Sequence, residues 1–223
     1  MRCHVYHAQM RSRNNHPVFE WLGRQSYEPV WQKMRFRAKE VAAGKAEEIV
    51  WTCEHQPVYT TGRRGVNNRL EEKLPAPFIE TDRGGETTFH GPGQLMFYPV
   101  IDLRKRGLGV KQYVHLLEQS CMDTLNNLGV PSERRIGFPG VWMAHGKIAA
   151  LGIRVSKGVA YHGMALNVSV AAHWFAAINP CGIGKKAANL SSFCTPPPLY
   201  DLAEMWHTYF CSRMRCLNTF TQR

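Results

Sequence analysis

The chain lacks the motifs that mark several common classes of enzyme site. Its 7 cysteines include no Cys-x-x-Cys pair and no zinc-finger spacing with histidine, so no structural metal site is expected. No Gly-x-x-x-x-Gly-Lys-[Ser/Thr] run is present, and no Gly-x-Gly-x-x-Gly run leads from a strand into a helix, which removes the usual phosphate cradles. A Gly-x-Ser-x-Gly run is missing too, so a serine hydrolase has no motif support.

Long apolar runs are also missing. None approaches the roughly 18 residues that a membrane-spanning helix needs, so no membrane partner is expected. The first residues carry an early arginine but no apolar block after it, which argues against a secretory signal. An odd number of scattered cysteines fits free thiols in a reducing compartment better than a disulfide framework. These features predict a soluble, cytoplasmic protein.

Acidic residues are scarce compared with basic ones. The chain holds 17 Asp and Glu against 28 Lys and Arg, which gives a net charge of +11. Such a charge favours an acidic partner, whether nucleic acid, an anionic membrane surface or an acidic protein. No basic helix with interleaved aromatic residues is present, so nucleic-acid binding explains the charge but has no motif. The basic loop at Arg63, Arg64 and Arg69 fits a docking patch and a solvated loop equally well.

Apolar residues recur at three- and four-residue steps in three places, which predicts three amphipathic helices. The first runs from Gln25 to about Gly44, and the second runs from Val110 to Leu128, followed by a helix-ending glycine. Cys121 falls within the apolar stripe of the second helix, so we interpret it as a core residue. The third helix follows residues 196–198, and its inner face is predicted to comprise Leu199, Leu202, Trp206 and Phe210.

Short runs rich in β-forming residues predict strands at residues 48–55, 78–82 and 95–102. From Gly140 onward, consecutive apolar runs predict three antiparallel strands, with a two-residue turn at His145–Gly146 and a second turn at residues 156–158. Residues 1–23 show little periodicity, and only a short strand near Val5 is expected there.

The length and composition suit one domain. A chain of 223 residues with 44% hydrophobic content can bury a sizeable core, and it contains no internal repeat or low-complexity linker. Helices placed separately around mixed strands indicate an α+β fold. We therefore predict a single α+β domain over residues 1–223.

The stretch at residues 83–93 is the richest in glycine, with four glycines together with Arg83 and His90. Glycine lets the main chain approach a ligand closely and adopt backbone angles closed to other residues. The composition therefore predicts a binding wall made largely of backbone. An ordinary turn between two strands is the alternative.

A nucleophilic cysteine is the best candidate for chemistry. Cys181 lies between a proline and a glycine, in irregular sequence outside any apolar stripe. Its thiol would need a neighbouring cation to lower the pKa, and either His90 or Lys147 could serve. Lys147 taken alone is a charge at the start of a strand, and His162 fits a core histidine as well as a functional one.

Six blocks of the sequence together resemble the lipoyl(octanoyl) transferases, which belong to the biotin and lipoate protein ligase fold family. The blocks occur in the family's order over about residues 51–192, the core of the predicted catalytic domain. They comprise residues 51–62, 83–94, 98–99, 146–154, 162–167 and 179–183.

The resemblance implies both a fold and an activity. The fold is a mixed, mostly antiparallel sheet with helices packed around it. The activity is transfer of an octanoyl group from octanoyl-acyl carrier protein to a lysine of lipoate-dependent proteins. The acceptors would be the lipoyl domains of 2-oxoacid dehydrogenases and the glycine cleavage H protein, with no cofactor, metal or nucleic acid involved.

The resemblance also implies roles for individual residues. Cys181 would carry the octanoyl chain as a thioester, and Lys147 would lower the pKa of that thiol and move its proton. An ATP-dependent ligase on the same fold is the rival interpretation, but it needs no cysteine, so the block at residues 179–183 argues against it. The acyl tunnel would be lined by Arg83, Gly84, Gly85, Glu86, Thr87, Thr88, Phe89, His90, Ala150, Leu151, Gly152, Gly163, Met164 and Ala165.

Overall fold

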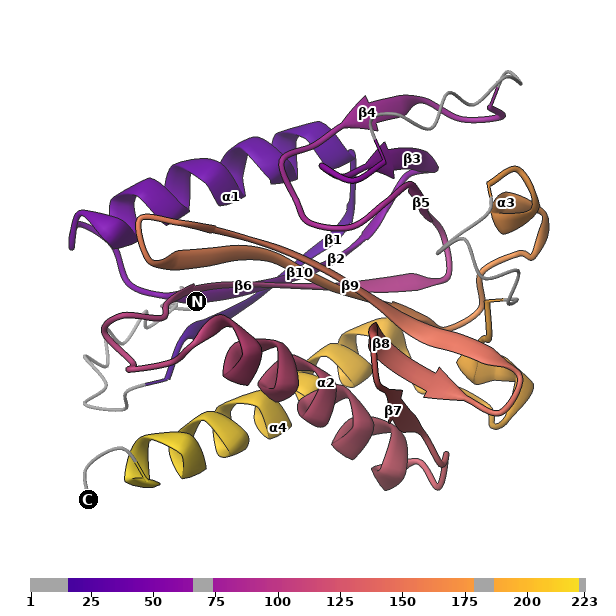
Figure 1. Cartoon of the computed structure of the whole chain (residues 1–223). Helices are drawn as coiled ribbons and strands as arrows, with labels where there is room; N and C mark the ends of the chain where they lie inside the picture. The colour runs from indigo at the N-terminus through magenta and orange to yellow at the C-terminus, as the bar shows by residue number, and fades with distance from the viewer. Residues whose placement is uncertain (1–15, 66–73, 179–186, 221–223) are drawn as a thin grey trace, which may run out of the picture.

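One mixed sheet forms the centre of the protein (Figure 1). The computed structural model describes residues 16–65, 74–178 and 187–220, and every structural statement concerns these residues. The sheet has seven strands, of which β1 and β2 run parallel while all other neighbours are antiparallel. In spatial order the strands are β1 (Val18–Gln25), β2 (Ile49–His55), β6 (Gln94–Asp102), β10 (Val159–Asn167), β9 (Gly146–Ser156), β8 (Phe138–Met143) and β7 (Glu133–Arg135).

A smaller sheet of three strands carries the glycine-rich stretch. It is built in the order β4 (Phe78–Glu80), β3 (Val58–Thr61) and β5 (Thr88–His90). The predicted loop at residues 83–93 therefore contains a short strand, because β5 pairs antiparallel with β3. This pairing holds residues 88–90, and the Arg63 N–H donates to the Arg83 carbonyl at 3.1 Å, so the stretch forms a defined wall.

Helices cover both faces of the large sheet (Figure 1). Helix α1 (Tyr27–Ala42) packs on β6 and β10 on one face. Helices α2 (Val110–Asn127) and α4 (Leu199–Phe220) pack on each other and cover the opposite face. Two short helical turns, α3 (His173–Ala176) and η2 (Leu190–Ser192), lie between β10 and α4 in the chain. No helix in these described ranges is long and apolar enough to cross a membrane.

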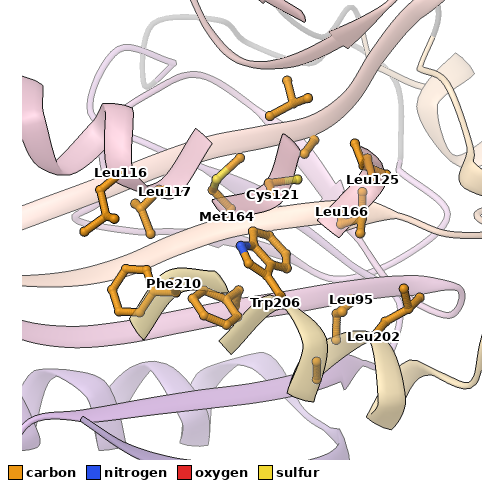
Figure 2. Close-up of a cluster of buried hydrophobic side chains, with 14 of the residues drawn as sticks. Leu95, Leu116, Leu117, Cys121, Leu125, Met164, Leu166, Leu202, Trp206 and Phe210 are labelled. Carbon is orange, nitrogen blue, oxygen red and sulfur yellow. The ribbon is translucent and has the colours of Figure 1, made fainter. Parts of the chain in front are cut away.

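The largest hydrophobic core lies between the sheet and helices α2 and α4. Figure 2 shows Trp206 and Phe210 of α4 gathered with Cys121 of α2 and Met164 of β10. The Trp206 ring stacks on Phe97 of β6 with centroids 4.5 Å apart, and both residues are fully buried. Burying one such side chain contributes about 1.5–3 kcal/mol, so this layer holds the two helices on the sheet.

Most of the predicted elements are confirmed. The first helix spans Tyr27–Ala42, and Gly44 follows it with a φ of +71°, as a helix-ending glycine does. Cys121 is buried in the core, and burial raises the pKa of its thiol. The inner face predicted for the last helix is buried at Leu202, Trp206 and Phe210, and Leu199 packs against the same cluster.

Two predictions about local structure are wrong. Residues 18–25 form strand β1, which the sequence pattern did not reveal because it is a half-buried edge strand stabilised by parallel pairing with distant β2. The hairpin turn lies at Ala144–His145, one residue earlier than predicted, because Gly146 already pairs with Met143 as the first residue of β9. The strand expected near Val5 lies outside the described residues.

Candidate active site

A cavity of about 370 Å³ lies where the glycine-rich wall faces the middle of β9 and β10. Every described residue of the predicted tunnel lines it except Phe89, and so does Lys147. Phe89 is fully buried on the other side of β5, where its ring stacks on Trp174 at a centroid distance of 4.7 Å. Alternation along a strand explains this, because its neighbours Thr88 and His90 face the cavity.

Other lining residues lie outside the predicted set. Five of them, Gln94, Tyr98, Ile153, His162 and Asn167, stand within the motif blocks, which was the available signal. The others have no motif to mark them, although Arg64 belongs to the unexplained basic loop; Arg69 of that loop lies outside the described part of the chain. They comprise Tyr27, Arg64, Met96, Gly137, Phe138, Pro139, Trp142, Phe175 and Ala187.

Lys147 stands at the start of β9 and is held by the neighbouring strand. Its Nζ donates a hydrogen bond of 2.9 Å to the Pro139 carbonyl and lies 4.7 Å from the centroid of the Trp142 ring. A carbonyl oxygen and an aromatic face both suit a protonated ammonium. Ala187 forms a parallel β-bridge with Lys147, so the chain that follows residues 179–186 returns to this point. Cys181 itself lies outside the residues that the structure describes.

The buried side chain of Arg83 holds the glycine-rich wall of the cavity together. Its Nη2 donates to the Thr60 carbonyl at 2.8 Å and to the Glu86 carbonyl at 2.9 Å, and its Nη1 donates to the Gly84 carbonyl at 3.0 Å. The side chain is buried, with 7% of its residue surface exposed. The guanidinium therefore ties together backbone carbonyls of its own loop and of β3.

The glycine-rich wall approaches β9 closely because Gly152 has no side chain. A Cβ atom at Gly152 would lie 2.8 Å from the Gly84 carbonyl oxygen. The N–H of Gly84 donates a hydrogen bond of 2.9 Å to the Ile153 carbonyl, which joins the wall to the same strand. The small residue in the block at residues 146–154 is thus required by a backbone contact.

His90 belongs to a directed chain of hydrogen bonds. Asn167 Nδ2 donates to the Ala188 carbonyl at 3.2 Å, so Asn167 Oδ1 accepts from Gln94 Nε2 at 2.9 Å. Gln94 Oε1 must then accept from His90 Nδ1 at 2.7 Å, which leaves the lone pair of His90 on Nε2. Burial, and then the positive charge of Arg83, place the pKa of His90 well below its usual value, so the ring is neutral.

His55 and Tyr98 form a second directed pair beside His90. His55 Nδ1 lies 3.0 Å from the Gln25 carbonyl, which can only accept, so Nδ1 carries the proton. His55 Nε2 therefore accepts from the Tyr98 hydroxyl at 2.9 Å. Burial lowers the pKa of His55 to about 4, so this imidazole is also neutral near pH 7. His90 and Tyr98, which both line the cavity, are thus neutral polar groups of its wall.

These buried histidines predict a loss of stability in mild acid. His55 titrates at about 4 when folded and near 6.5 when unfolded, so the unfolded chain binds more protons between these pH values. Lowering the pH from 7 to 5 should decrease the free energy of unfolding by roughly 2 kcal/mol through His55 alone, and His90 adds to the loss. Urea unfolding at a series of pH values measures this. His55→Gln should flatten the dependence, whereas His115→Gln, on the exposed face of α2, should leave it unchanged.

The chain is similar in sequence to octanoyltransferases. It is 48% identical over 182 residues to an octanoyltransferase of Halorhodospira halophila, covering 82% of this chain and 79% of that protein. It is 47% identical over 165 residues to an octanoyltransferase of Thiobacillus denitrificans, covering 74% of this chain and 75% of that protein.

Solved structures with the same fold include ligases. A bipartite lipoate protein ligase of Thermoplasma acidophilum superposes with a TM-score of 0.66 at 12% identity, over 92% of this chain and 91% of the other. A biotin protein ligase of Aquifex aeolicus gives a TM-score of 0.53 at 14% identity, over 89% and 70%. At such identities the likeness concerns the fold, which is the predicted mixed sheet with flanking helices.

The family itself follows from the sequence match. The model of the lipoyl protein ligase A/B catalytic domain matches residues 26–211, which include the walls of the cavity and Lys147. On this match, and on the identity to the octanoyltransferases, the chain belongs to the lipoyl protein ligase A/B catalytic domain family.

Proposed function

We propose that the protein transfers an octanoyl group from octanoyl-acyl carrier protein to a lysine of a lipoyl domain, through a thioester on Cys181. The observation that supports this most is the cavity, since its walls come from the glycine-rich stretch and from small residues of β9 and β10. Its volume of about 370 Å³ lies in the range of pockets that enclose small ligands. Relatives at 47% and 48% identity are named octanoyltransferases.

The reaction would proceed in two balanced steps. In the first, the Cys181 thiolate attacks the carbonyl carbon of the octanoyl thioester, and the carbon–sulfur bond to the carrier breaks. The proton lost by Cys181 passes through Lys147 to the carrier thiolate. In the second, the acceptor lysine amine attacks the acyl-cysteine carbonyl, an amide forms, the carbon–sulfur bond to Cys181 breaks, and the amine proton returns to the Cys181 sulfur. A covalent intermediate splits one difficult transfer into two easier ones.

Neither step needs ATP. Exchange of one thioester for another is close to isoenergetic, and forming an amide from a thioester is downhill. An ATP-dependent ligase is the alternative function. The solved ligases support it through the fold alone, because they are only 12% and 14% identical to this chain. Its chemistry would leave Cys181 without a role.

Of the two candidate cations, Lys147 is the one that suits Cys181. A thiol pKa is lowered by a nearby positive charge, and His90 is held neutral by burial. Lys147 lines the cavity and pairs through its backbone with Ala187, which follows Cys181 by a few residues in the sequence. We therefore assign to Lys147 the stabilisation of the thiolate and the movement of its proton.

The partners and compartment are proposed on the same grounds. Acyl carrier proteins are acidic, and a net charge of +11 would steer them to this chain. A lipoate protein ligase of the same fold is described with its E2 lipoyl domain, which supports lipoyl domains of 2-oxoacid dehydrogenases as acceptors, and the glycine cleavage H protein by extension. None of the five described cysteines is part of a disulfide, which fits the cytoplasm. We also propose that residues 1–223 form one catalytic domain.

Intact-protein mass spectrometry tests the reaction class. The purified chain is mixed with octanoyl-acyl carrier protein without ATP, and we expect an adduct of one octanoyl group that hydroxylamine removes. A parallel sample receives free octanoate and ATP and should show no adduct. If octanoyl transfer to a lipoyl domain occurs only with free octanoate and ATP, the protein is a ligase and the proposal is wrong.

A further inference from the structure

Asp82 collects three side-chain hydrogen bonds on one carboxylate, directly before Arg83 in the chain. Trp31 Nε1 of α1 donates to Oδ1 at 2.8 Å, and His162 Nε2 of β10 lies 2.8 Å from the same oxygen. The Tyr161 hydroxyl donates to Oδ2. Burial alone would raise the pKa of Asp82, but the hydrogen bonds from His162, Tyr161 and Trp31 lower it far below its usual value. The carboxylate is thus an ionised acceptor shared by three elements.

His162 reaches this carboxylate only because β10 is distorted there. Ala160 and Met164 pack in the core under α2 and α4, whereas Tyr161 and Ala165 pack on the α1 side. Regular alternation would place His162 with the first pair. Its φ of +60° instead turns the imidazole to the α1 side, where it stacks on the Tyr161 ring at a centroid distance of 5.1 Å. Neighbouring residues of a regular strand point to opposite faces and could not stack in this way.

The distortion has a cause in the neighbouring strand. Pro99 lies in the interior of β6, opposite this part of β10, and it has no N–H to donate. The pairing of β10 with β6 accordingly continues on both sides but omits residues 161–163. A strained backbone angle at a non-glycine residue persists only where the surroundings hold it, and such angles gather at functional sites. Here the bond to Asp82 holds it.

Asp82 adjoins one wall of the cavity, and His162 belongs to the other. Arg83, which follows Asp82, begins the glycine-rich wall, and His162 lies in the β10 wall next to Gly163. The hydrogen bond between Asp82 and His162 therefore spans from one wall to the other. Together with the bond from Gly84 N–H to the Ile153 carbonyl, it fixes how far apart the walls stand.

We propose that Asp82 is a positioning residue that sets the width of the acyl cavity and thereby selects a straight acyl chain over a branched one. This inference rests on the proposed function for its substrate. Asp82 does not line the cavity, so its influence passes through Arg83 and His162. A wall released from this carboxylate would move away from β10 and admit a wider chain.

The test compares two acyl groups of equal carbon number. The rate of acyl-enzyme formation is measured with octanoyl- and 6-methylheptanoyl-acyl carrier protein, and their kcat/KM values are expressed as a ratio. In Asp82→Ala the preference for the straight chain should fall by about tenfold. In Asp82→Asn it should stay near wild type, because the amide oxygen still accepts from Trp31 and His162 while its NH₂ donates to the Tyr161 oxygen.

Asp102 supplies a matched control. It is a buried carboxylate at the end of β6 that binds the Arg104 and Lys105 N–H groups and does not line the cavity. Asp102→Ala should lose stability and yet keep the preference for the straight chain. If Asp82→Ala keeps the wild-type ratio, or if Asp102→Ala loses it equally, the inference is wrong.

A second variant and a second readout cover the remaining outcomes. If Asp82→Ala does not fold, His162→Asn takes its place, because asparagine tolerates a φ of +60° but is too short to bridge the walls. An unchanged ratio of kcat/KM values in this variant overturns the inference.

Hydrogen exchange of the Gly84 N–H is a readout that needs no acyl transfer. Faster exchange in the variant than in wild type and Asp102→Ala supports a positioning role even if no octanoyl adduct forms, and equal exchange contradicts it.

Discussion

Replacing Cys181 with alanine is expected to abolish the octanoyl adduct and to slow transfer to a lipoyl domain by at least about 1,000-fold. No other described thiol is suited to replace it. Cys53 lies nearest to the site histidines, 3.7 Å from His55 Nε2, but it is fully buried and burial raises the pKa of its thiol. The measurement is the mass of the intact protein after mixing with octanoyl-acyl carrier protein, together with the rate of lipoyl-domain acylation.

Two controls make this result specific. Cys194→Ala changes a half-buried thiol and Cys216→Ala changes an exposed one, and both variants should keep the adduct and the rate. A full adduct in Cys181→Ala would show that the nucleophile is elsewhere, and peptide mapping would identify it. An adduct on Cys53 in particular would contradict its assignment as a buried, unreactive thiol.

Lys147→Met tests the role of the lysine separately from that of the nucleophile. Methionine keeps an unbranched stem against Trp142 but removes the charge and the proton carrier, so acylation of Cys181 should slow by about 100-fold at neutral pH. The deficit should shrink as pH rises, because solution hydroxide can then form the thiolate. Lys111→Met, at an exposed position of α2, serves as the control. An equal deficit at every pH would remove the proton-transfer role from Lys147.

Replacing Gly163 with alanine is expected to destabilise the fold strongly, although it adds only one methyl group. The new Cβ would lie 2.0 Å from the Phe97 carbonyl oxygen and 2.9 Å from Pro99 Cδ, both on the adjacent central strand β6. Neither atom can move without shifting the sheet, so we expect a loss of about 3 kcal/mol or more in the free energy of unfolding. Urea unfolding followed by circular dichroism measures it.

Gly129→Ala is the control for this change. Gly129 has a φ of +72°, and no atom lies within 4 Å of the position that a Cβ would take. Alanine there meets open space and costs only about 1–2 kcal/mol of backbone strain. Gly163 differs because its cost comes from contact with the neighbouring strand. If the two variants lose equal stability, the close approach of β10 to β6 is not what requires glycine at position 163.

Much of the fold could be predicted from the sequence because its signals are local. The apolar stripes around Cys121 and Trp206 repeat with the period of a helix, and a periodic stripe needs no knowledge of its partner to be recognised. The glycine-rich stretch that begins at Arg83 was predicted as a binding wall for a similar reason, since glycine lets a backbone approach a ligand wherever the chain lies. The predicted lining residues of β9 and β10 came instead from the resemblance to the lipoyl(octanoyl) transferases, because no local pattern marks them.

The sequence by itself therefore determined the helices, most strands, the family and the walls of the cavity. Only the tertiary structure decided which side chains face that cavity. Phe89 points away from it, because β5 pairs with β3 and alternates. His162 lines it for two reasons. Pro99 of β6 has no N–H to pair with β10 at this point, and the carboxylate of Asp82, far away in the sequence, hydrogen-bonds to the imidazole. Such orientations depend on hydrogen bonds between distant segments, which no local pattern of residues records.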